Sequence, residues 1–228
     1  ANTTGVSNAV VGANAMDANT TGGDNSVLGF GAMGANTIGG RNVSVGENSL
    51  YTNVAGFRST AVGFEALFTQ NPGSSATDVY NTAVGYSAGR AVTTGTQNTF
   101  VGGLAGDGSQ TGTGNTALGY QSLSGVVTGG YNTALGWGAG QANTSGLNNT
   151  SVGTQALFLN TVGNYNVAMG EGALYTNVDG SQSVAIGRLA LYTQEPASAV
   201  NMLNVAVGYA AGTAVTTGTY NTLIGGLA

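Results

Sequence analysis

Short segments in which polar and apolar positions alternate recur along the chain at a nearly constant spacing. One such segment, Asn-Thr-Ala-Leu-Gly, stands at residues 115–119 and again at 132–136, and elsewhere valine, isoleucine or methionine replaces the leucine. Alternation with a period of two predicts a short β-strand. Because the strand returns at a nearly fixed interval, the pattern predicts a stack of similar coils and not a globular domain.

A series of marker glycines sets this repeat. Successive markers keep a seventeen-position spacing, as from Gly119 to Gly136, and the spacing is longer only before Gly85 and before Gly208. Most markers are followed by a second glycine ten positions later, which implies two corners in each coil. We therefore predict an all-β repeat solenoid: a flattened parallel β-roll of about 13 coils with two short strands in each coil. The markers are Gly12, Gly29, Gly46, Gly63, Gly85, Gly102, Gly119, Gly136, Gly153, Gly170, Gly187, Gly208 and Gly225.

The two faces of the predicted strand carry different side chains. The residue before every marker glycine is Val, Leu, Ile or Met, which predicts an inward-facing core column. The residue two before the marker then points outward, because neighbouring side chains of a strand alternate. That outer position is mainly alanine, as at Ala83 and Ala134. Small apolar residues on an outer face predict burial against another chain.

A polar column stands four residues before the markers. It is asparagine in eleven units and serine in the other two, at Ser59 and Ser183. In a parallel stack each side chain lies ~4.8 Å from its copy, so the amides can hydrogen-bond along a ladder. We interpret this column as structural ladders or turn caps and not as a ligand site.

Two insertions interrupt the repeat. They recur seven units apart and contain the only prolines of the chain, Pro72 and Pro196. Proline disrupts strand pairing, so residues 68–80 and 192–203 are predicted to form projecting loops on a single repeat domain that spans 1–228. The neighbouring Asn71 and Glu195 join the two prolines as candidate partner contacts, while tolerated insertions explain the same segments equally well.

The composition narrows the range of functions. The 228 residues include 41 glycines, no cysteine and no histidine, and only 6% of them are charged. The net charge of −5 and the lack of a basic run argue against nucleic-acid partners. No apolar stretch reaches the ~20 residues needed for membrane insertion. We predict no catalytic, cofactor-binding or metal-binding residues, and hence no enzyme.

The residue after the marker glycine is the most variable position and is often aromatic. An exposed column of rings there could stack on sugars of a host surface, or it could simply shield the edge of the coil. A carboxylate pair for glycan hydrolysis, Glu47 and Glu65, has no supporting second motif. The aromatic members, which we call the aromatic stripe, are Phe30, Phe64, Tyr86, Tyr120, Trp137 and Tyr209.

A threonine array raises ice binding as a further alternative. Threonine occupies one position, three residues before the marker, in six consecutive units from Thr60 to Thr150. This position shares the predicted inward face with the aliphatic column, so a flat external lattice of hydroxyls does not follow.

The repeat resembles a known family of surface proteins. Residues 183–187 (Ser-Val-Ala-Ile-Gly) and 204–208 (Asn-Val-Ala-Val-Gly) are similar to YadA-like head repeats of trimeric autotransporter adhesins. Residues 81–89 also resemble repeats of phage tail fibres and of surface fibres that carry a chaperone domain. The resemblance implies a left-handed β-roll assembled as an intertwined or side-by-side homotrimer, with the alanine-bearing strands facing the threefold axis.

The resemblance also suggests a function. We expect a structural or adhesive segment of an extracellular fibre, on a virion or a bacterial surface, that contacts a host glycan or protein receptor. Because the chain begins and ends inside the repeat pattern, we expect it to be part of a longer fibre. The alternatives are a carbohydrate-binding module in its own right, a fibre-borne glycan hydrolase and an ice-binding protein.

Overall fold

The computed structural model of the chain describes residues 2–108, 110–125 and 127–228. These residues form a parallel β-solenoid of about 13 turns and contain no helix, as the regular spacing of the marker glycines predicts. The chain divides into two compact units, residues 1–114 and 115–228, which are described separately.

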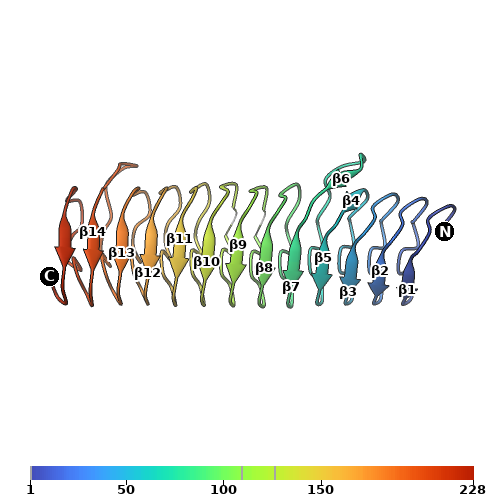
Figure 1. Cartoon of the computed structure of the whole chain (residues 1–228), viewed down its shortest axis with the longest axis horizontal. Coiled ribbons are helices and arrows are strands. Elements are labelled where there is room, and N and C mark those ends of the chain that lie inside the picture. Colours follow the sequence, from blue (N-terminus) through green and yellow to red (C-terminus); the bar gives the residue numbers. More distant parts are fainter. Residues whose placement is uncertain (1, 109, 126) are drawn as a thin grey trace. The chain divides into compact units, whose positions relative to one another are not determined.

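Each coil contributes one three-residue strand to a parallel sheet (Figure 1). Strands of successive coils pair in register, so that Thr60 lies beside Thr82 and Thr133 beside Thr150. In unit 1 the strands are β1 (Ala9–Val11), β2 (Ser26–Leu28), β3 (Val43–Val45), β5 (Thr60–Val62), β7 (Thr82–Val84) and β8 (Thr99–Val101), with a separate pair formed by β4 (Gly56–Phe57) and β6 (Thr77–Asp78). In unit 2 they are β9 (Thr116–Leu118), β10 (Thr133–Leu135), β11 (Thr150–Val152), β12 (Val167–Met169), β13 (Val184–Ile186), β14 (Val205–Val207) and β15 (Thr222–Ile224).

The expectation of a second strand in every coil is wrong, because within the described residues only β4 and β6 are strands outside the main sheet. The wall that follows the marker glycine is a series of tight turns, in which residues such as Glu65 and Leu67 have φ values of 51° and 52°. A bulky side chain at positive φ is unfavourable by itself. The stack holds it there, because Leu67 is fully buried and its N–H donates to the carbonyl of Ala88 in the next coil at 3.0 Å.

The predicted faces of the strand are reversed in the structure. The central alanines, such as Ala83 and Ala117, are fully buried, whereas Leu118 and Leu135 are 44% and 40% exposed. The reason is the thinness of the coil. Leucines from the turn wall, such as Leu157 and Leu174, fill the interior and leave room only for small side chains from the strand.

One coil shows this complementarity of size directly. Phe100 takes the position of a strand alanine in β8 and is fully buried. Four residues after the marker, where most other coils carry leucine or methionine, this coil and the one before it carry glycine. A Cβ added at Gly89 or Gly106 would lie 2.9 Å or 2.4 Å from the Phe100 ring. At this level the interior holds a phenylalanine from the strand because the turn wall carries glycine.

The asparagine column is a buried hydrogen-bonded ladder, as predicted. Asn132 donates from Nδ2 to the carbonyl of Gly146 at 2.8 Å, and its Oδ1 accepts the backbone N–H of Asn149 at 3.0 Å. A second column, which the sequence analysis missed, stands seven residues after the markers. Its member Asn143 donates to the same Gly146 carbonyl at 3.2 Å, while Asn160 donates to Asn143 at 3.1 Å.

The marker glycine is required by both conformation and space. Gly119 has a φ of 133°, a region that side-chain-bearing residues rarely adopt. A Cβ added there would lie 2.6 Å from the carbonyl oxygen of Gly136 in the next coil. Each coil can approach its neighbour at ladder distance only because this corner has no side chain.

Leucine-to-alanine substitutions distinguish the two faces of the coil. Leu157→Ala removes a side chain that is 1% exposed and should cost about 2–5 kcal/mol of unfolding free energy. Leu135→Ala, the matched control on the outer face, should cost less than about 1 kcal/mol. Chemical unfolding at low chain concentration measures both values. A larger loss of unfolding free energy in Leu135→Ala than in Leu157→Ala would show that Leu135 belongs to the core.

Candidate functional site

The most extensive candidate surface is the outward side of the sheet. We call it the outer strand face and define it as the first and third residues of each three-residue strand. In β9 and β10, for example, Thr116, Leu118, Thr133 and Leu135 are all exposed, while the alanine between each pair is buried. The aliphatic column of this face in unit 2 consists of Leu118, Leu135, Val152, Met169, Ile186, Val207 and Ile224. Contiguous exposed apolar surface of this kind is typical of an interaction site.

The threonine array also lies on the outer strand face. Thr99, Thr116 and Thr133 are exposed, and Thr60, Thr82 and Thr150 are half-buried at the same register. Their predicted inward orientation is therefore wrong, for the same reason that the aliphatic column was misplaced. The face combines hydroxyl and aliphatic columns, spaced by the ~4.8 Å between strands.

The aromatic stripe lies on the surface. Its six aromatic residues are 37% to 60% exposed. Phe64 and Tyr86 stack on each other with ring centroids 5.4 Å apart. In unit 2, Arg188 pairs with Glu171 at 3.1 Å and lies over the ring of Tyr209. Part of the stripe thus engages its own neighbours, as expected for residues that shield a coil edge.

A second aromatic column stands five residues after the markers, and we call it the ring ladder. Phe158, Tyr175 and Tyr192 stack in unit 2 with 5.1 Å between successive centroids. Tyr51 and Phe68 stack in unit 1 at 5.4 Å. The sequence analysis missed this column, although the equal spacing of the three unit 2 rings along the chain was a readable signal.

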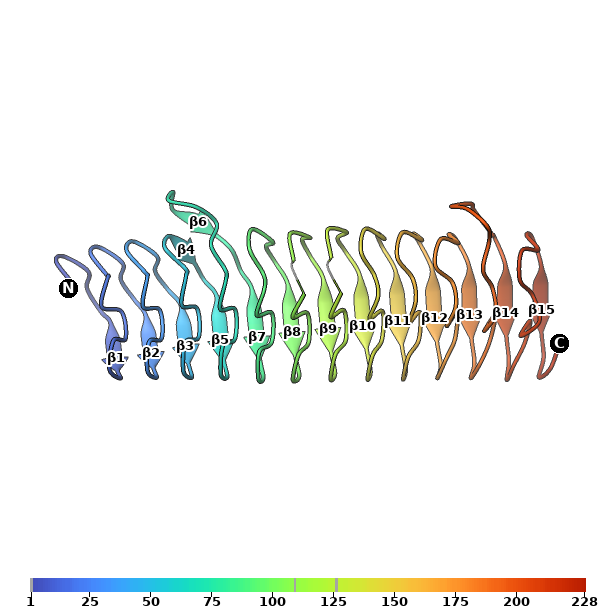
Figure 2. The same ribbon diagram turned by 180° about the vertical axis from the view of Figure 1, so that it is seen from behind.

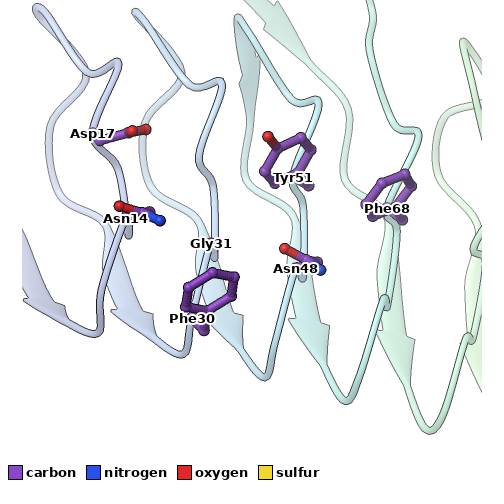
Figure 3. Close-up of a pocket in the computed structure, with 7 residues that line it drawn as sticks. All are labelled: Asn14, Asp17, Phe30, Gly31, Asn48, Tyr51 and Phe68. Atoms are coloured by element: carbon purple, nitrogen blue, oxygen red, sulfur yellow. The ribbon is translucent and has the colours of Figure 1, made fainter.

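A groove of about 470 Å³ lies beside the ring ladder in unit 1. Four successive coils contribute to it, with Asn14 and Asp17 on one coil and Phe68 on the fourth (Figure 3). It brings one predicted contact residue, Phe30, together with residues that were not predicted. The lining residues are Asn14, Asp17, Phe30, Gly31, Asn48, Tyr51 and Phe68.

The inserted segments differ in how they present the four predicted contacts. In unit 1, Asn71 is exposed and Pro72 is half-buried. In unit 2, Glu195 is half-buried and Pro196 is buried, so residues 197–201 form the exposed part of that segment. In each unit the inserted segment extends beyond the outline of the regular coils (Figure 2).

At each insertion a glutamine side chain continues the hydrogen bonds of the amide ladder. Gln194 donates from Nε2 to Asn177 at 2.9 Å and accepts from Asn204 at 2.8 Å. The same glutamine bonds Ser183, which replaces the usual asparagine. Gln70 and Ser59 form the corresponding pair in unit 1, at 3.0 Å. The longer glutamine amide spans the displaced backbone, so an inserted loop does not interrupt the ladder.

A carboxylate replaces a backbone carbonyl at the second insertion. In a regular coil one carbonyl accepts three successive N–H groups, as the Thr37 carbonyl does from Thr20, Thr21 and Gly22. At the corresponding corner of unit 2, Glu195 Oε2 accepts the N–H of Val178 at 2.6 Å. Burial raises the pKa of the Glu195 carboxyl above its ordinary value, and the nearby Asp179 adds to the rise.

The acidic side chains of the described residues are scattered and do not form a metal site. No cluster of three or more Asp, Glu, His or Cys side chains there could hold a metal ion. Glu65 forms an ion pair with Arg90, so the proposed partner of Glu47 is already engaged. Across the same residues, no helix has the length and apolar character required to cross a bilayer.

Comparison of the chain with family models, with curated proteins and with solved structures gave no match.

Glu195 should make stability depend on pH. Its folded-state pKa is raised, so the stability it contributes is present below its ordinary pKa and is lost as pH rises through the raised value. Glu195→Gln keeps the acceptor for Val178 but cannot ionise. The variant should match the parent Tm near about pH 4 and exceed it increasingly toward pH 7.

The control for this measurement is Glu47→Gln, because Glu47 is exposed and has no role in the corner. It should leave the Tm within experimental error of the parent across the range. A Glu195→Gln variant that loses stability at neutral pH would contradict the burial cost assigned to this carboxylate.

Proposed function

We propose that this chain is a structural and adhesive segment of an extracellular fibre, assembled as a homotrimer through the outer strand face. The observation that carries the proposal is the aliphatic column of that face, which continues through every strand of each unit and whose members are exposed or half-buried. Burial of apolar surface contributes roughly 25 cal/mol per Å², so a column of this length favours association strongly.

The proposed trimer differs from the one expected from the sequence in the face that each chain turns toward the threefold axis. The alanines first assigned to the threefold axis fill the interior of the coil instead. In the proposed assembly the aliphatic and threonine columns of three chains face one another around the axis. The similarity of residues 183–187 to adhesin head repeats supports three chains over two.

The chemistry of the chain suits an extracellular fibre, on a phage tail or a bacterial surface. The chain has no lysine and only four arginines, and each of the four forms an ion pair with a neighbouring carboxylate. Trypsin-like proteases therefore have few residues at which to cleave. Residues 73–76 and 197–201 remain exposed in the segments that extend from the coils, where they can contact a host glycan or protein.

Ice binding is a second candidate, favoured by the outward threonines. Residues two apart on a strand are ~6.6 Å apart and strands are ~4.8 Å apart, so the outer strand face is a regular two-dimensional lattice. Hydroxyl and methyl groups of Thr116 and Thr133 would face the solvent in a monomer. This candidate requires the outer strand face to be free, which the trimer does not allow.

Disrupting the outer strand face should disrupt assembly. Leu135→Asp places a carboxylate on the aliphatic column and, in a trimer, brings three charges into an apolar interface. We expect association to weaken at least tenfold while the β-rich circular dichroism spectrum is kept. Analytical ultracentrifugation measures the mass, with Tyr131→Asp, which is exposed away from the strand, as the control.

A parent chain that remains monomeric at tens of micromolar would reject the trimer. Depression of the freezing point by that monomer, abolished in Leu135→Asp, would then favour the ice-binding candidate.

A further inference from the structure

A column of exposed side chains runs along unit 2 just before the strands of the main sheet. Its members stand five residues before the marker glycines, and we call them the tyrosine–amide column. All of them have φ values between 55° and 59°, so their side chains leave the backbone of successive coils in the same direction. The members are Tyr131, Asn148, Tyr165 and Gln182, and all are exposed.

Backbone hydrogen bonds keep this column in register from coil to coil. The N–H of Tyr165 donates to the carbonyl of Leu147 at 3.0 Å, and the N–H of Gln182 donates to the carbonyl of Asn164 at 2.9 Å. Adjacent members are therefore separated by the ~4.8 Å between neighbouring strands, and the two tyrosines by ~9.6 Å. Along the stack the column alternates an aromatic ring with an amide.

The tyrosine rings of this column are open to a ligand. Tyr131 is 64% exposed and Tyr165 is 57% exposed. Tyr80 holds the same position in unit 1, but there the guanidinium of Arg58 lies over its ring at 5.4 Å. In unit 2 the column neighbours of Tyr165 are amides, so no cation of the column covers its ring.

The surface around the two tyrosines is neutral. Residues 115–170 contain no Asp, Glu, Lys, Arg or His. Leu147, which is 40% exposed, adds apolar surface beside Asn148 in the coil between the tyrosines. Nucleic acids and acidic glycans bind where basic side chains oppose their charge. The composition therefore favours an uncharged ligand.

A neutral glycan matches this pattern of groups. The faces of a pyranose are C–H surfaces that can pack on aromatic rings, and its hydroxyl groups can bond to amides. In an extended β-linked chain, successive sugars advance by nearly the coil spacing, so alternate sugars match the ~9.6 Å between the tyrosines. A protein partner instead requires a well-packed apolar core in the interface, and here an amide separates the rings.

We propose that the tyrosine–amide column binds an extended neutral glycan that lies along the stack of coils in unit 2. Tyr131 and Tyr165 pack on alternate sugar rings, and Asn148 bonds to hydroxyl groups of the sugar between them. The proposal rests on the adhesive role proposed above and names the ligand class. It does not depend on the trimer, because the column lies outside the outer strand face.

Tyrosine-to-asparagine substitutions in the intact chain test the site. Asparagine already stands in this column at position 148, with a φ of 55°, so Tyr131→Asn and Tyr165→Asn introduce a residue that accepts the backbone conformation. Calorimetry measures the binding of cellohexaose, xylohexaose and N-acetylated chitohexaose. We expect the parent to bind at least one of these probes, and each substitution to weaken that binding at least tenfold.

The length of the glycan tests the spacing of the tyrosines. A trisaccharide of the bound probe reaches both rings, whereas the disaccharide reaches only one. In the parent the trisaccharide should therefore bind at least tenfold more tightly than the disaccharide. In Tyr131→Asn and in Tyr165→Asn the two should bind alike, so either variant suffices if the other does not fold.

Tyr80→Asn is the matched control, because Tyr80 holds the same column position in unit 1 beside Arg58. It should leave glycan binding unchanged, and so should Leu135→Asp, which disrupts only the outer strand face. Circular dichroism and sedimentation compare the fold and mass of each variant with those of the parent. A trimer that binds no probe would reject this site alone, whereas a monomer that binds would keep the site and reject the trimer.

Several results would overturn the proposal. These are a parent that binds no neutral probe at millimolar concentration, equal affinity of the parent for the disaccharide and the trisaccharide, and loss of binding in Tyr80→Asn. Tighter binding of hexagalacturonic acid than of every neutral probe would reject the assignment to neutral glycans.

Discussion

The buried amide ladder is the constraint on which the rest of the structure depends. Second-corner glycine carbonyls accept side-chain amides, and in several coils they accept two, as Gly146 does from Asn132 and Asn143. Inside a coil such a carbonyl has no water to bond, and leaving it without a partner costs about 1–3 kcal/mol. The ladder satisfies these groups and also joins neighbouring coils, because Asn132 accepts the N–H of Asn149. The same asparagine side chains therefore hydrogen-bond the buried carbonyls and hold neighbouring coils in register.

The ladder also explains how the repeat tolerates extra residues. At each insertion a serine and a glutamine replace two asparagines, and the longer amide of Gln70 or Gln194 bridges the displaced coil. Glu195 accepts the N–H of Val178 with a carboxylate oxygen at a corner where a regular coil uses a backbone carbonyl. The inserted segments thus vary the surface of the solenoid without breaking the hydrogen-bonded interior.

The thinness of the coil controls what reaches the surface. Its interior holds leucines from the turn wall and alanines from the strand, so the larger aliphatic residues of the strand are left on the outside. The surface is consequently patterned in columns, with an apolar strand face, an aromatic stripe and a ring ladder. The columns differ locally between the units, as at position 34, where unit 1 has glycine and the corresponding residue of unit 2 is Phe158.

The amino-acid sequence by itself determined the period, the number of coils, the parallel stacking and the asparagine ladder. These features follow from strict repetition, since identical residues at a fixed interval can only stack in register. It did not determine which side of the strand faces inward. Alternation with a period of two is symmetric, and the choice between Ala117 and Leu118 depended on leucines of the opposite wall at positive φ. The tertiary structure also decided the groove beside Tyr51 in unit 1, because its lining residues come from four successive coils and meet only when these coils stack.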